Sequence, residues 1–119
     1  MPYVTGFLLP MSADRRGDYL AAAEKSWPLF KEFGALAQHE CWGEDIPPGE
    51  VTSFPKAVDL KDDEVVVIGW VVWPDRATAD AAWAKMQEDE RMAGLDMPFD
   101  GKRMIYGGFQ EIFSRSVEE

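Results

Sequence analysis

The sequence predicts an α+β domain in which one antiparallel sheet of four strands carries two helices on one face. Three observations support this class. Strand-like and helix-like patterns alternate along the chain, with one hairpin-like excursion between the second and third strands. Residues 64–73 form a strand pattern with almost no polar face, which is typical of a central, covered strand. The 119 residues are enough for one core, so we expect a single domain over residues 1–119.

The chain begins with a strand and a helix. Residues 3–11 alternate as a strand whose two faces are both largely apolar. Ser12 or Asp14 can cap a helix that continues to Phe33. Pro28 lies inside this helix and has no amide hydrogen to donate, so we expect a kink just before it or two shorter helices.

The middle of the chain contains the next two strands. Residues 35–44 alternate as a second strand, and residues 46–49 form a proline-rich loop. Residues 51–60, which Pro55 interrupts, are expected to be a short irregular strand or a loop with some pairing. The segment 64–73 then follows as the central strand.

The last third contains a helix and a final strand. Asp75 can cap a helix that reaches about Met92. Residues 95–102 are expected to be a loop, residues 103–113 a strand, and residues 114–119 a charged tail.

This order is that of a ferredoxin-like βαββαβ sandwich. Two helices cover only one side of such a sheet, whereas the expected strands are apolar on both sides. A second copy of the chain would cover the other side, so we expect a homodimer.

Composition and charge exclude several function classes. The 22 acidic and 12 basic residues give a net charge of −10, which disfavours nucleic acid as a partner. No apolar run approaches the ~20 residues of a membrane span, and the first residues lack the pattern of a signal peptide, so we expect a cytoplasmic protein that does not bind a membrane. The single cysteine and single histidine indicate no metal site, and the absence of glycine-rich phosphate motifs indicates no nucleotide cofactor.

Three segments resemble a known family. They are residues 30–36 (FKEFGAL), 40–42 (ECW) and 97–109 (MPFDGKRMIYGGF). In this order they are similar to the YbaA-like proteins, a bacterial group of unknown function in the dimeric α/β-barrel superfamily. The resemblance implies that two ferredoxin-like sheets pair into one barrel. It implies no catalytic residue, and the superfamily ranges from heme-degrading and quinol-forming monooxygenases and chlorite dismutase-like enzymes to effector-binding domains of transcription regulators.

Glu40 is the first candidate site residue. Glu40 and Trp42 lie on the same face of the strand, and we assign this face to the barrel interior. Burial there would raise the pKa of the Glu40 carboxyl group and suit it to proton transfer. The alternative is a structural ion pair with Arg103 or Lys102. The expected ligand-binding set is Glu40, Trp42, Trp70, Arg103, Met104 and Tyr106, with Trp73 and Gln110 as possible neighbours.

His39 is the only histidine and a common type of proton-transfer group. His39 shares a strand face with Cys41. If His39 lowered the pKa of the Cys41 thiol, Cys41 could act as a nucleophile. Strand geometry separates the two backbones by roughly 6–7 Å, which is long for a direct hydrogen bond between the side chains. The simpler interpretation is a partly buried His39 against the helices and a small core cysteine. Glu40, Tyr106 and His39 are the candidates for catalysis.

The turn at Asp100–Arg103 has two interpretations. In the first, Asp100 and the basic residues of the turn form structural salt bridges. In the second, Lys102 and Arg103 bind an anionic ligand at the mouth of the cavity.

Three functions are compatible with this pattern. The leading one is a homodimer that binds a small molecule in a cavity near the sheet. The alternatives are a small cofactor-independent monooxygenase-like enzyme, and an interaction or scaffold protein without a ligand.

Overall fold

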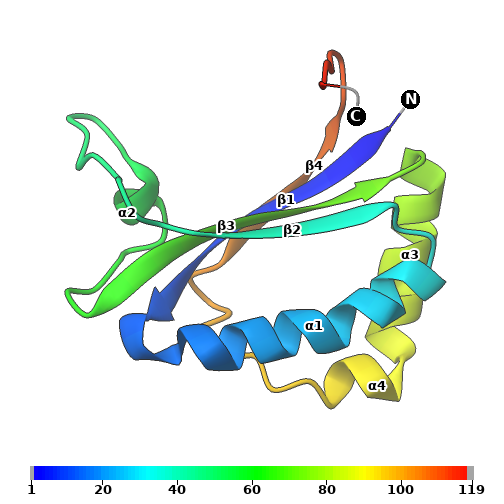
Figure 1. Cartoon of the computed structure of the whole chain (residues 1–119), viewed down its shortest axis with the longest axis horizontal. Coiled ribbons are helices and arrows are strands. Elements are labelled where there is room, and N and C mark those ends of the chain that lie inside the picture. Colours follow the sequence, from blue (N-terminus) through cyan, green and yellow to red (C-terminus); the bar gives the residue numbers. More distant parts are fainter. Residues whose placement is uncertain (1, 118–119) are drawn as a thin grey trace.

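The computed structural model describes residues 2–117, which form a four-stranded antiparallel sheet with helices (Figure 1). The strands are β1 (Tyr3–Ser12), β2 (Ala37–Trp42), β3 (Glu64–Trp73) and β4 (Ile105–Gln110). They lie in the order β2-β3-β1-β4, and every neighbouring pair is antiparallel. This is the predicted ferredoxin-like topology, with β3 in the interior of the sheet.

The helices are η1 (Ala13–Arg15), α1 (Arg16–Glu32), α2 (Phe54–Ala57), α3 (Arg76–Glu88) and α4 (Glu90–Ala93). In Figure 1, α1, α3 and α4 lie on one side of the sheet and α2 lies on the other. The core fills much of the space between the sheet and α1 and α3. Its two clusters of buried side chains centre on Val71 and Trp73 against the alanines of α3, and on Leu9 and Val67 against Tyr19.

The second face of the sheet is apolar and largely open. Ile68, Ile105 and Phe109 are exposed there. Together with Trp70 and with Phe54 of α2 they line a groove of about 560 Å³. The two-sided apolar character expected from the strands is therefore present, and one side remains uncovered within the single chain.

Pro28 does not divide the first helix, so the expectation of two shorter helices was wrong. α1 continues through it to Glu32. Both Pro28 and Glu24, whose carbonyl loses its partner, are exposed, so water can take the missing bond. Gly34 ends the helix region with a φ of 107°, which favours glycine.

The segment 51–60 is a loop that contains a helical turn, and the expected alternative of a short strand was wrong. Ser53 accepts a hydrogen bond from the amide of Lys56 at 3.2 Å, and Pro55 occupies the first turn of α2. A capping serine followed by proline in the first turn is a helix-start signal, and here it prevails over the strand-like spacing.

The helix after β3 begins as predicted but is interrupted. Asp75 caps it by accepting a hydrogen bond from the amide of Thr78 at 2.8 Å. Asp89 then breaks it, because its carboxylate binds the amide and guanidinium of Arg91, which also reaches Glu32 at the end of α1. The final strand is shorter than predicted, and the exposed side chains beyond it include Ile112 and Phe113.

Candidate functional site

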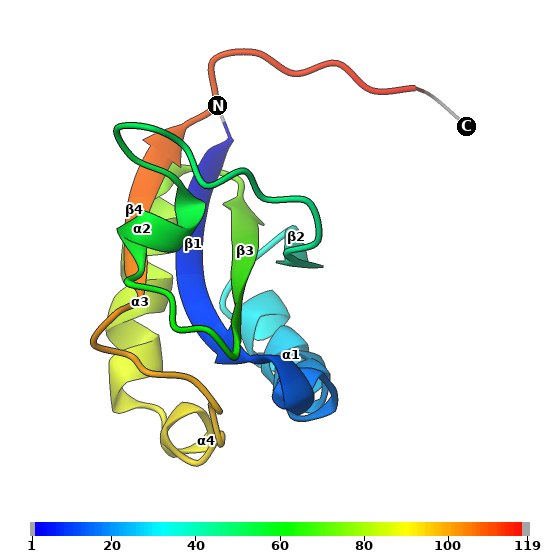
Figure 2. The ribbon, with the colours of Figure 1, turned by 90° about the vertical axis from the view of Figure 1, so that its left-hand side faces the viewer.

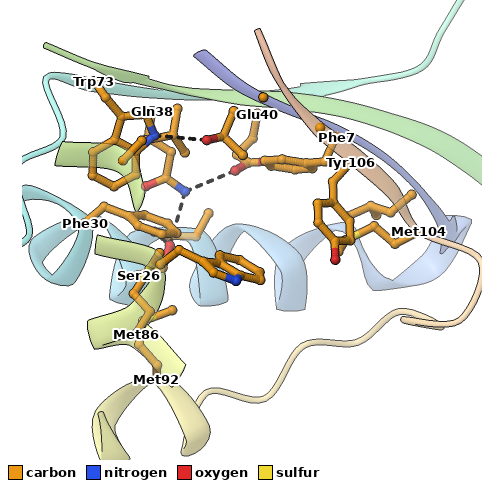
Figure 3. A pocket seen from close by; sticks show the side chains of 18 of the residues that line it. Phe7, Ser26, Phe30, Gln38, Glu40, Trp73, Met86, Met92, Met104 and Tyr106 are labelled. Carbon is orange, nitrogen blue, oxygen red and sulfur yellow. Dashed lines mark hydrogen bonds between the residues drawn. The ribbon is translucent and has the colours of Figure 1, made fainter. Parts of the chain in front are cut away.

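A cavity of about 530 Å³ lies between the sheet and helices α1 and α3 (Figure 3). Its walls are mostly aromatic and aliphatic. The large side chains around it are Tyr3, Phe7, Tyr19, Phe30, Trp73, Trp83, Met86, Met92, Met97, Phe99, Met104 and Tyr106. A concave, mainly apolar site of this size is typical of small-molecule binding.

Small residues leave room for this cavity. α3 turns Ala79 and Ala82 toward the sheet, so the helix lies close to it without filling the space beside it. In the floor, Gly69 of β3 lies beneath Phe7 and Glu40, and a Cβ there would be 2.5 Å from Cζ of Phe7. The glycine therefore allows these two side chains to lie flat across β3.

One end of the cavity is polar and is organised around Glu40. Tyr19 of α1 donates a hydrogen bond to Oε1 of Glu40 at 2.5 Å. Gln38, two residues before Glu40 on the same face of β2, donates to Oε2 at 3.0 Å and to Oγ of Ser26 at 3.1 Å. Ser26 in turn donates to the carbonyl of Ala23 at 2.8 Å. Figure 3 shows the amide of Gln38 between Ser26 and Glu40.

Burial controls the protonation of this network. Desolvation raises the pKa of Glu40, although the hydrogen bonds from Tyr19 and Gln38 oppose the shift. Burial also raises the pKa of Tyr19, and its hydrogen bond to Glu40 adds to that shift. Tyr19 therefore keeps its hydroxyl proton and remains a hydrogen-bond donor. Glu40 is the side chain of this network that can take up or release a proton.

Three of the predicted site residues meet in this cavity. Glu40, Met104 and Tyr106 all line it, as does Trp73. The assignment of the Glu40 face to the interior of a two-sheet barrel was wrong, because this face is the one that the helices cover. Tyr106 lies at the rim, with 62% of its surface exposed and its ring 5.9 Å from that of Trp83.

Trp42 and Trp70 do not line this cavity. Trp42 shares the Glu40 face but packs against the Leu9 cluster, with the guanidinium of Arg16 5.6 Å from its ring centre. Trp70 lies on the open face of the sheet, where its ring stacks on His39 at 4.9 Å.

Arg103 is also outside the cavity. It binds both carboxylate oxygens of Glu64 at 2.7 Å and Asp100 at 3.0 Å. The predicted alternative of an ion pair between Glu40 and Arg103 was therefore wrong, and the Asp100 turn has structural ion pairs. Hydrogen bonds from Arg103 lower the pKa of Glu64 to about 2.

His39 and Cys41 are both exposed on the open face. The interpretation of His39 as partly buried against the helices was wrong, because the helices cover the opposite face. Its ring and Glu40 project from opposite sides of β2, so the two do not form one catalytic group. Among residues 2–117, no cluster of three or more potential ligands could hold a metal ion.

Sequence reasoning missed Tyr19, Ser26 and Gln38 as site residues. In the sequence, Tyr19 is one of the apolar residues at helical spacing in the first helix, a pattern that does not indicate a site. The available signal was the pair Gln38 and Glu40, two polar residues at i and i+2 on a strand face expected to be buried.

Comparison with known proteins agrees with this fold. A family model described as "Protein of unknown function (DUF1428)" matches residues 2–101. The uncharacterised protein YbaA of Escherichia coli K12 and that of Shigella flexneri are each 51% identical over 114 residues, covering 94% of this chain and 97% of theirs. A crystal structure of a dimeric ferredoxin-like protein from an uncultured marine organism has a TM-score of 0.52 and 15% identity, covering 98% of this chain and 100% of that one. The resemblance to YbaA-like proteins is confirmed.

Within the described residues, no helix has both the length and the apolar character needed to cross a membrane.

Proposed function

Since the chain belongs to the DUF1428 family, whose description states no function, we propose a function from its own cavity. The protein is a cytoplasmic homodimer that binds a small, largely apolar molecule between its sheet and its helices. The observation that carries this proposal is the cavity of about 530 Å³ with aromatic walls and one polar end. The walls supply apolar contact area, and the network of Glu40, Gln38 and Tyr19 orients one polar group.

Binding in the cavity can be tested with indole as the probe. Ala23 faces the cavity from α1, whereas Ala21 is exposed on the same helix. We expect indole to perturb the amide resonances of β1, α1 and α3 in wild-type protein. Ala23→Phe should abolish this response because the new ring occupies the cavity, and Ala21→Phe should retain it. Equal responses of the two variants, or no response in wild type, would refute binding in this cavity.

The homodimer is supported by the open face of the sheet. Its exposed apolar residues form a groove, and the segment after β4 leaves the body of the chain (Figure 2). In this segment Phe113 is 73% exposed and Ile112 86%. A second copy would cover both the groove and the tail. The marine ferredoxin-like protein is described as dimeric, which also favours a dimer here.

Light scattering after size exclusion tests the dimer. We expect about twice the chain mass of 13.4 kDa at micromolar concentration. Phe113→Ser should weaken the dimer because it removes apolar area, whereas Ser116→Ala in the same exposed tail should not. A monomeric wild-type protein would contradict this part of the proposal.

A second candidate is a small enzyme that uses Glu40 as an acid or base. The raised pKa of a carboxyl group in an apolar cavity favours it. Tyr106 at the rim is a possible partner, but His39 is not, because it lies on the other face. If screening of quinols and small aromatics finds a turnover, Glu40→Gln should abolish it without changing the oligomeric mass. An unchanged rate would dispose of this candidate.

The cytoplasm is compatible with the single cysteine. Cys41 is free and exposed, a state that a reducing compartment preserves. Fractionation of the native host, followed by detection of the protein, tests this location.

A further inference from the structure

The three polar side chains linked to Glu40 have no spare hydrogen-bond donor. Both amide hydrogens of Gln38 are used, one by Glu40 and one by Ser26. The hydroxyl of Tyr19 donates to Glu40, and that of Ser26 donates to the carbonyl of Ala23. The donors of these three side chains are therefore all satisfied within the protein.

Acceptor capacity remains at the same place. Oε1 of Gln38 is buried and has no hydrogen-bond partner within residues 2–117. Turning the amide over would not remove the problem, because the oxygen would then face the carboxylate and the nitrogen would be unpartnered. The carboxylate of Glu40 accepts one bond on each oxygen and can accept more. Since Oε1 of Gln38 has no accessible surface, the carboxylate of Glu40 is the acceptor that a ligand in the cavity reaches, and a ligand that donates to it gains affinity.

The charge of the lining has the same sign throughout. The ionisable side chains in the lining are the acids Glu40 and Asp80 and two tyrosines besides Tyr19, and the lining includes no lysine, arginine or histidine. Within the described residues, Glu40 has no salt-bridge partner. An anionic ligand would be repelled, whereas a cation would compensate a carboxylate that burial has desolvated.

The walls also suit a cation with an apolar body. Aromatic rings from five elements, β1, α1, β3, α3 and β4, line the cavity, and they include Phe7, Phe30 and Trp83. The faces of aromatic rings attract cations and pack well against flat apolar groups.

We propose that the molecule bound in this cavity is a compact aromatic or aliphatic amine, which presents its protonated nitrogen to Glu40. This inference rests on the proposed small-molecule function and specifies the class of its ligand. The ammonium donates to the carboxylate of Glu40 and supplies the positive charge that is missing beside it. The apolar body of the amine occupies the aromatic part of the cavity.

Three indoles of similar shape test the inference on wild-type protein: tryptamine, which is cationic, 3-propylindole, which is neutral, and indole-3-acetate, which is anionic. By isothermal titration calorimetry at neutral pH, tryptamine should bind about tenfold or more tightly than 3-propylindole. Indole-3-acetate should bind more weakly than both. Glu40→Gln should abolish the advantage of tryptamine, whereas Glu88→Gln, an equal change of charge on the exposed side of α3, should preserve it.

The outcomes separate this inference from the function on which it rests. If 3-propylindole or indole-3-acetate binds as tightly as tryptamine, the amine is refuted while small-molecule binding stands. An advantage of tryptamine that survives Glu40→Gln also refutes it. If none of the three indoles binds, both the amine and the proposed function are overturned.

Discussion

Replacing Gly69 by alanine tests whether the floor of the cavity positions Glu40. The new Cβ would be 2.5 Å from Cζ of Phe7 and 2.6 Å from Oε1 of Glu40. Carbon atoms in contact are normally about 3.5 Å apart or more, so both side chains must move by about 1 Å. Overpacking of this kind costs about 1–3 kcal/mol, and removing a strand glycine returns about 0.5–1 kcal/mol. We expect a net loss of about 1–2 kcal/mol of unfolding free energy.

The matched control is Gly6→Ala in the neighbouring strand β1. A Cβ there would be 3.5 Å from Cε1 of Phe109, an ordinary contact, so this variant should be as stable as wild type or slightly more stable. Urea unfolding measures both variants, and titration with indole measures the site. Gly69→Ala should also weaken indole binding, because Phe7 and Glu40 leave their positions. If both variants have the same stability and the same indole affinity, Gly69 does not position the site.

Three further predictions concern other contacts. Since Arg103 lowers the pKa of Glu64 to about 2 from an ordinary 4.5, this carboxylate contributes its stabilisation fully above about pH 4.5 and loses it as the pH falls toward 2. Glu64→Gln should therefore cost about 1–2 kcal/mol at pH 7, and urea unfolding should show the difference from wild type disappearing in acid. Val67→Asp should abolish folding because Val67 is 1% exposed, whereas Ile68→Asp, at 39%, should leave a folded monomer by circular dichroism and light scattering. Tyr19→Phe should raise the Glu40 carboxyl titration midpoint measured by carbon-13 NMR, because it removes a bond that favours the charged form.

The fold could be predicted because its strands carry strong local signals. The apolar run of β3 matches the predicted strand from Glu64 to Trp73 at both ends. The cap at Asp75 also acts locally, through an amide three residues away. Helix ends set by distant partners could not be found in this way. Asp89 separates α3 from α4, where a single helix was predicted, and its carboxylate binds Arg91. The second partner of Arg91 is Glu32, which lies 59 residues away in the sequence.

The faces of the sheet explain why half of the site was misplaced. Alternation correctly separates Glu40 from His39, but both faces are apolar, so the pattern does not indicate which one the helices cover. Trp70 was therefore grouped with Glu40 although it stacks on His39. The expected partner of Arg103 was Glu40, whereas the structure pairs it with Glu64. The reason is related, because residue type alone does not distinguish two glutamates and only their positions in the sheet do.

The cavity and its polar end both reduce the stability of the folded chain. An unfilled space among buried side chains loses dispersion contacts, and larger residues at Ala23 or Ala79 would fill part of it. Burial also makes the charge on Glu40 unfavourable, as the direction of its pKa shift indicates. Natural domains are stable by only about 5–15 kcal/mol, and features that cost stability concentrate where function requires them. The two costs coincide at one place, with an unpartnered buried acceptor between them. A ligand that donates hydrogen bonds to Glu40 and brings apolar surface would offset both costs, which is the physical reason for placing the function here and not at the exposed His39 and Cys41.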